Sequence, residues 1–168
     1  DPGLIAARDL FNIPIIGLGE AAMLSACLFG KKFSIISFTN AMSSWYEESV
    51  EILGLQSRYA GFRAIEGVVL AIDQIQSLQK DALISSAQKA IEVDGGDVII
   101  FAGAPLSGFK KIVQSEINVP IIDCAEAAVK QAELAIAMNS KVHESKKLPP
   151  KISIGVEKEL ADYLSHKS

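Results

Sequence analysis

The sequence predicts an α/β protein in which mostly parallel sheets are flanked by helices. Three observations carry this prediction: unbroken β-branched runs typical of buried parallel strands, helix-like segments that alternate with them, and an internal repeat. The 168 residues are 49% hydrophobic, so the chain can bury a sizeable core, in one domain or in two small lobes.

The repeat joins segment 12–22 to segment 118–128. The Asn, the Pro, both Ile, the Glu and both Ala of the motif stand in the same places in the two copies. Each copy also follows a short helix-like segment that is preceded by a Pro-containing loop. Two such units predict two pseudo-symmetric lobes, with an active-site cleft between them. Alternatively, the similarity is chance, because Pro-Ile-Ile strands followed by Ala-rich helices are common in α/β proteins.

The lobes are expected to divide the chain unevenly. Residues 1–30 and 141–168 are assigned to the first lobe, and residues 31–140 to the second. The chain opens inside what reads as a loop, Asp1-Pro2-Gly3, so we expect further residues upstream that complete the amino end of the first lobe.

The opening of the chain reads as helix, strand, helix, strand. Leu4 to Phe11 suits a short helix, and Ile13 to Leu18 a buried strand, because its apolar run is bounded by Pro and Gly. A helix starts at Glu20 and ends at Gly30, since glycine is a natural C-cap. Lys32 to Phe38 then alternates like a strand.

The middle of the chain continues the alternation. Thr39 or Asn40 can cap a helix from Met42 to Leu53, which ends before a glycine. Arg58 to Ile65 alternates weakly and is assigned to a strand. Leu78 to Val93 has apolar residues on one helical face, which indicates an amphipathic helix.

The last part begins with the most strand-like run, Asp97 to Phe101, and a loop of small residues after it. A polar run with Pro149-Pro150 reads as a connector. The remaining elements are expected as a helix, a strand and two further helices, in order Phe109 to Glu116, Val119 to Ile122, Glu126 to Asn139 and Glu157 to His166.

Composition excludes several classes of protein. The net charge is −4 and the basic residues are scattered, which argues against nucleic acid as a partner. The apolar stretch from Leu10 to Gly30 is interrupted by Pro14 and Glu20, so it suits a strand-turn-helix better than a membrane span. Two cysteines without metal-ligand spacing, and no signal-peptide pattern, predict a soluble cytoplasmic protein with no metal site.

In open parallel sheets, ligands bind beyond the carboxyl ends of the strands. The expected site is therefore formed by the loops that follow the strands. The Gly103 loop is the best of these, because small residues let backbone N–H groups approach a carboxylate or enolate; the alternative is a tight turn without a ligand. The candidate substrate-binding residues are Gly17, Glu20, Ser37, Thr39, Asn40, Ala104, Pro105, Leu106 and Ser107.

Several of these residues have a second interpretation. Glu20 and its repeat partner Glu126 are either acid–base residues or first-turn carboxylates that complement the helix dipole. Ser37, Thr39 and Asn40 either bind a substrate carboxylate or imide, or cap the following helix.

Three stretches carry a family resemblance: DVIIFAGAPLSGF from Asp97 to Phe109, DPGLIAAR from Asp1 to Arg8, and IIGLGEAA from Ile15 to Ala22. Together with the ending around Pro149-Pro150, they resemble the Asp/Glu/hydantoin racemase superfamily, nearest its hydantoin and allantoin racemase branch. The resemblance implies a cofactor-independent isomerase with two pseudo-symmetric α/β lobes. It also implies one cysteine from each lobe, flanking the α-carbon of the substrate.

Neither of these cysteines is present in the sequence. The first would precede Asp1, and the second would fall at Gly103, which has no side chain. Cys124 is the thiol on a site loop that can substitute for it, and Asp123 is the nearest carboxylate. Alternatively, Cys124 is a small packing residue, as Cys27 is expected to be.

The leading function is therefore isomerisation at the acidic α-carbon of a small amino-acid derivative such as a 5-substituted hydantoin, without a cofactor. A decarboxylase of the same fold that uses a single thiol is a second possibility, and a non-catalytic small-molecule binding protein is a third. A homo-oligomer is expected, because compact enzymes of this size commonly associate and the segment Met42 to Leu53 is aromatic.

Overall fold

The sheet at the centre of the molecule has four strands, in the order β2-β1-β3-β4. The structure is a computed structural model that describes residues 1–65, 72–138 and 157–159. All three strand pairs are parallel, which confirms the α/β class predicted from the sequence. The strands are β1 (Phe33–Ser37), β2 (Tyr59–Ala64), β3 (Val98–Phe101) and β4 (Ile121–Asp123).

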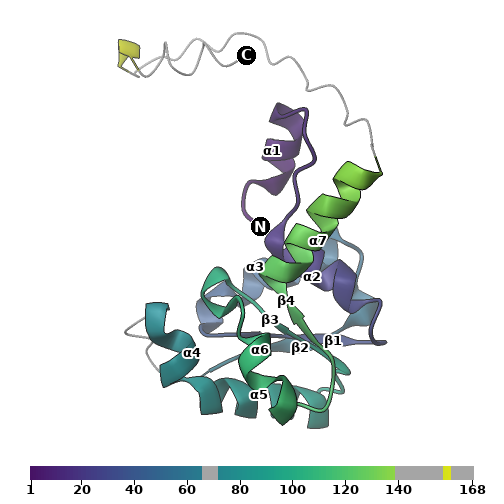
Figure 1. The fold of residues 1–168 in the computed structure, drawn as a ribbon, viewed down its shortest axis with the longest axis vertical. Coiled ribbons are helices and arrows are strands. Elements are labelled where there is room, and N and C mark those ends of the chain that lie inside the picture. The colour runs from purple at the N-terminus through teal and green to yellow at the C-terminus, as the bar shows by residue number, and fades with distance from the viewer. Residues whose placement is uncertain (66–71, 139–156, 160–168) are drawn as a thin grey trace.

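Helices cover both faces of this sheet (Figure 1). One face is packed by α2, α3 and α7, and the other by α4, α5 and α6. Short 3₁₀ helices connect several of these elements. The α-helices are α1 (Leu4–Leu10), α2 (Leu18–Ala26), α3 (Ser43–Ile52), α4 (Ile75–Leu78), α5 (Lys80–Glu92), α6 (Lys110–Val113) and α7 (Cys124–Ala137).

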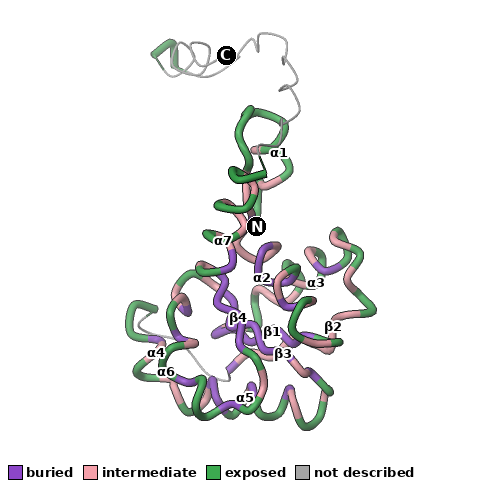
Figure 2. The backbone as a smooth tube through the Cα atoms, turned by 45° about the vertical axis from the view of Figure 1, so that its right-hand side comes forward, coloured by how far each residue is buried: buried purple, intermediate pink, exposed green. Residues whose placement is uncertain are grey.

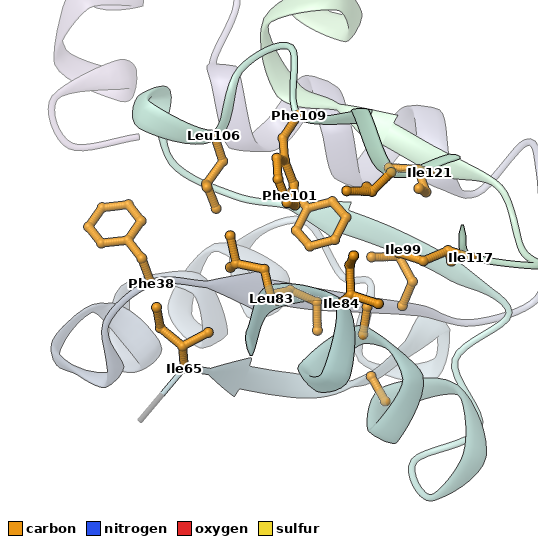
Figure 3. Close-up of a cluster of buried hydrophobic side chains, with 14 of the residues drawn as sticks. Phe38, Ile65, Leu83, Ile84, Ile99, Phe101, Leu106, Phe109, Ile117 and Ile121 are labelled. Atoms are coloured by element: carbon orange, nitrogen blue, oxygen red, sulfur yellow. The ribbon is translucent and has the colours of Figure 1, made fainter. Parts of the chain in front are cut away.

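Alternation along the central strands divides the core into two clusters. Ile35 and Ile100 face α2 and α7, whereas Ile36 and Phe101 face α5 and α6. The second of these clusters is shown in Figure 3. Because both faces are covered, β1 and β3 are buried along their whole length, as Figure 2 shows.

At the amino-terminal ends of the strands, charged side chains bind the neighbouring backbone. Asp97 accepts hydrogen bonds from the backbone N–H groups of Lys31 (3.0 Å) and Lys32 (2.8 Å). The guanidinium of Arg58 donates to the carbonyl oxygens of Lys31 (2.6 Å), Cys27 (3.0 Å) and Gly30 (2.6 Å). These contacts satisfy the polar groups left free where α2 ends and β1 begins.

The strand expected from Ile13 to Leu18 is absent, so that prediction is wrong. The segment runs without regular structure up to Gly17, and α2 already begins at Leu18. A strand needs a neighbour for its backbone groups, and within residues 1–65 and 72–138 no strand pairs with this segment. The carbonyl oxygen of Ile15 instead accepts a hydrogen bond from Nε of Arg8, at 3.0 Å.

The helices of the internal repeat nevertheless correspond. The alignment of Asn12 with Asn118 also pairs Leu18 with Cys124, and these residues begin α2 and α7. It pairs α1 with residues 110–116, which are helical as well. The two repeat helices contact each other through Gln131, whose Nε2 donates to the carbonyl oxygen of Ala21 (2.9 Å) and to Oγ of Ser25 (3.1 Å).

Other differences are smaller. The helix expected from Leu78 to Val93 begins earlier, as α4, and is interrupted at Gln79 before α5. The connector around Pro149-Pro150 and most of the helix from Glu157 to His166 lie outside the described residues, so the division into lobes stays a prediction.

Among the helices of the described residues, none has the length and apolar character that a membrane crossing requires.

Candidate functional site

Three predicted site loops lie along one edge of the sheet. Ser37, Gly103 and Asp123 stand at or just after the carboxyl ends of β1, β3 and β4, which are neighbours in the sheet. Gly17 precedes α2, whose other end, at Cys27, contacts Arg58 where the strands begin, so Gly17 is placed towards the carboxyl ends of the strands. At the first turn of α2, the N–H groups of Gly19 (2.9 Å) and Glu20 (2.8 Å) donate hydrogen bonds to the carboxylate of Asp1.

The Gly103 loop is a short 3₁₀ helix, Ala104–Leu106, that starts from a glycine with φ of +110°. Gln76 holds this loop from α4: its Nε2 donates to the carbonyl oxygens of Pro105 (2.9 Å) and Ser107 (2.8 Å). The side chain of Leu106 is buried in the core, so it fixes the loop rather than facing its open side.

Cys124 lies beneath the Gly103 loop. Its Sγ is 3.4 Å from the carbonyl oxygen of Phe101, and its sulfur also accepts a hydrogen bond from the N–H of Gly103. Burial raises the pKa of this thiol to about 12, and the negative charge of Asp123 acts in the same direction. Cys124 is therefore a protonated thiol near neutral pH, so it is not a base, and its raised pKa also makes it a weaker acid than an exposed thiol.

Asp123 ties the end of the same loop to α7. Its Oδ1 accepts a hydrogen bond from the N–H of Glu126 at 3.0 Å, which caps the helix. Its Oδ2 accepts a short hydrogen bond from the N–H of Gly108. The carboxylate is almost fully buried, and both of its oxygens are engaged with backbone donors. Its contacts are those of an anchor for the loop.

The residues from Ser37 to Asn40, at the end of β1 and just after it, divide between the interior and the surface. The hydroxyl of Ser37 is buried and donates to the carbonyl oxygen of Ala102 at 3.3 Å. Thr39 accepts a hydrogen bond from the N–H of Ala41 at 3.3 Å, so it caps the 3₁₀ helix that Asn40 begins. Asn40 is exposed. Capping, one of the two interpretations of this segment, is thus realised at Thr39.

The two repeat-related glutamates are paired with cations. Glu20 forms a bidentate ion pair with Arg8, and Glu126 forms a single contact of 3.2 Å with Lys110. Neither carboxylate is directed into the Gly103 loop by these contacts. No group of three or more His, Cys, Asp or Glu side chains in the described part of the chain is placed to hold a metal ion.

Two residues of the site could not be identified from the sequence. Gln76 stands in a stretch without a clear pattern, far along the chain from the loop that it supports. The ring of Tyr46 stacks on Phe62, with ring centroids 5.7 Å apart. Its hydroxyl also forms a hydrogen bond with Ser37, and burial, followed by the proximity of Cys124, raises the pKa of this phenol.

Comparison with known proteins identifies the family. A family model described as Asp/Glu/Hydantoin racemase matches residues 1–132. A hydantoin racemase of Paenarthrobacter aurescens is 30% identical over 138 residues, which cover 82% of this chain and 58% of that protein. A hydantoin racemase of Rhizobium meliloti is 32% identical over 133 residues, 79% of this chain and 55% of that protein. The chain thus spans little more than half the length of these relatives.

Solved structures agree with this assignment. An allantoin racemase from Pseudomonas fluorescens superposes with a TM-score of 0.84 at 25% identity, over 92% of this chain and 67% of that one. An allantoin racemase from Klebsiella pneumoniae gives a TM-score of 0.82 at 27% identity, over 95% and 66%. Sequence and fold together show that the chain belongs to the Asp/Glu/hydantoin racemase family.

Proposed function

We propose that the full-length protein is a cofactor-independent isomerase that acts at the acidic α-carbon of a small amino-acid derivative such as a 5-substituted hydantoin. Similarity to hydantoin racemases over four-fifths of the chain supports the reaction class. The observation that carries the proposal is the thiol beneath the Gly103 loop: Sγ of Cys124 donates to the carbonyl oxygen of Phe101, at the carboxyl end of β3, at 3.4 Å.

The reaction needs two groups on opposite faces of the substrate. A base removes the α-proton from one face, an acid returns a proton to the other face, and hydrogen-bond donors stabilise the enolate between the two steps. We assign the acid to Cys124, because among the described residues it is the thiol that lies at the carboxyl ends of the strands. In the full-length protein, a base that precedes Asp1 would lie at this same edge, because Asp1 accepts hydrogen bonds from the first turn of α2. The cleft itself is proposed to lie between this edge and a second lobe.

Two measurements on the full-length protein test the proposal. Loss of optical rotation reports inversion of a 5-substituted hydantoin, and ¹H NMR in deuterated water reports exchange of its α-proton. Replacing a cysteine that precedes Asp1 by Ala should abolish both. Cys124→Ser should suppress inversion more strongly than exchange, because an alcohol is a poorer acid than a thiol.

The matched control is Cys27→Ser. Cys27 is a half-buried thiol at the opposite end of α2 from the site, so both rates should be unchanged. Exchange that survives loss of the upstream cysteine would contradict the thiol mechanism. Equal inversion in the wild type and in Cys124→Ser would remove Cys124 from it.

A second candidate function is favoured by Gly103. Because no side chain stands at this position, a reaction with a single thiol remains open: the carbon–carbon bond of a malonate breaks, carbon dioxide leaves, and a thiol protonates the resulting enolate. Release of carbon dioxide from an arylmalonate without hydantoin turnover would favour this lyase. Binding of these compounds without turnover of either would favour a binding protein.

A further inference from the structure

The space next to Gly103 is occupied by an aromatic ring. A Cβ atom built on Gly103 would lie 2.9 Å from Cε1 of Phe38, closer than carbon atoms approach without repulsion. The backbone adds a second obstacle, because the φ of +110° at Gly103 is one that side chains rarely allow. A residue with a side chain is therefore opposed at this position both by its neighbour and by its backbone.

Phe38 cannot easily yield this space. It follows β1 directly, is only 9% exposed, and belongs to the same hydrophobic cluster as Ile65 and Leu106. Figure 3 shows its ring at the end of this cluster, between the sheet and the loop that carries Leu106. Turning a rigid buried ring away from Gly103 would open a void or expose apolar surface, and both cost stability.

We propose that Phe38 is a positioning residue for the Gly103 loop: its ring takes the place of a side chain at position 103, so the loop presents main chain to the candidate site. Two other glycines show that a positive φ alone does not create this situation. Gly54 and Gly108 have φ of +67° and +83°, and a Cβ atom on either would meet nothing within 4 Å. The catalytic consequence of this assignment rests on the proposed function, whereas its steric basis does not.

A double-mutant cycle tests the steric basis without any substrate. The full-length protein is compared with Gly103→Ala, Phe38→Leu and the double variant by urea unfolding. Strain in the backbone cancels in the coupling term, so only the contact between the two side chains remains. We expect Phe38→Leu to relieve the cost of Gly103→Ala by at least about tenfold in the unfolding equilibrium constant.

Gly54→Ala combined with Phe38→Leu is the matched control. Gly54 has a positive φ and an open environment, so the effects of these two substitutions on the unfolding equilibrium should be additive. Additivity in the Gly103 cycle would overturn the assignment. If Gly103→Ala alone does not fold, a folded double variant supports the assignment, and failure of both to fold overturns it.

A second experiment connects the pair to chemistry. The variant Gly103→Cys is compared with the double variant that also carries Phe38→Leu. Reaction with 5,5′-dithiobis(2-nitrobenzoic acid) measures the reactivity of the new thiol. A 5-substituted hydantoin serves to measure the rate of inversion relative to the rate of proton exchange. We expect a reactive new thiol and a higher ratio of inversion to exchange only when Phe38 is also replaced.

The two experiments fail in different ways. If the cycle shows coupling between Gly103 and Phe38 but no variant turns over a hydantoin, the steric role of Phe38 stands and the proposed isomerase is rejected. An additive cycle in a protein that racemises hydantoins would reject the role of Phe38 and leave the function in place. A rise in the ratio with Gly103→Cys alone would also contradict the role of Phe38.

Discussion

The carboxylate of Glu20 accepts hydrogen bonds from both terminal nitrogens of Arg8, at 2.9 and 2.8 Å. Its repeat partner Glu126 pairs with Lys110 of α6 at 3.2 Å. In both copies of the repeat, the glutamate in the first turn of the longer helix thus forms an ion pair with a positively charged side chain of the short helix before it. Both copies of the repeat therefore have an ion pair between their two helices, even though only the second copy has a strand between them.

Removing this fastening should have a modest cost. Arg8→Ala is expected to lower the free energy of unfolding by about 0.5–1 kcal/mol, because the bidentate pair is partly exposed and the bond to Ile15 is lost with it. Urea unfolding measures this change. Lys130→Ala is the control, since its pair with Glu133 is more exposed and should contribute almost nothing. Equal effects of the two substitutions would contradict the prediction.

Gln76 should control the order of the Gly103 loop. Gln76→Ala leaves the carbonyl oxygens of Pro105 and Ser107 without their donor, which costs about 1–2 kcal/mol. Amide hydrogen exchange at Leu106 and Ser107 should become about tenfold faster. Gln114→Ala removes two similar bonds elsewhere, so it should destabilise the protein without this local effect. Unchanged exchange at both amides in Gln76→Ala would refute the assignment.

Cys124 should make the protein less stable in alkali. Its pKa is raised in the folded state, so above the unfolded pKa of about 9 the unfolded chain loses a proton that the folded chain keeps. Stability is therefore lost as the pH rises from about 9 towards 12. Between pH 8 and 10, wild-type protein should lose about 1 kcal/mol more than Cys124→Ser, because serine does not ionise there. Parallel urea curves for the two proteins would disprove the burial of this thiol.

Arg58 should hold the end of α2. Its guanidinium donates to three carbonyl oxygens, so Arg58→Ala is expected to destabilise the fold by about 2 kcal/mol. Arg58→Lys should restore less than half of this, because an ammonium cannot reproduce the planar fork. Urea unfolding of the two variants distinguishes them. Full rescue by lysine would show that charge alone is required at this position.

Much of the fold follows from local pattern. The apolar runs that became β1 and β3 are buried on both faces, and α3 ends just before Gly54 as predicted. The predicted end of the preceding helix at Gly30 is wrong, because α2 already ends at Ala26. Ile13 to Leu18 failed because its pattern matches that of β4, yet a strand also requires a neighbour that a local pattern does not show. The position of the Gly103 loop follows from strand order, since every strand ends at the same edge.

The partners within the site were harder to predict. The sequence indicates that Cys124 follows a strand, but not that its sulfur lies against the backbone of Gly103. Gln76 and Phe38 act on the loop from separate elements, and their spacing in the chain gives no sign of this. Such contacts depend on how distant segments pack, which periodicity and capping rules do not describe.

The supports of the Gly103 loop also set a limit on protein engineering. Ser37, Phe38, Gln76 and Asp123 all lie against it, and they come from three separate segments of the chain. Residues 102–108 are therefore unsuitable as an exchangeable cassette: a loop grafted from a relative would arrive without the side chains that hold its shape. A successful loop exchange would also require substitution of the supporting side chains outside the loop.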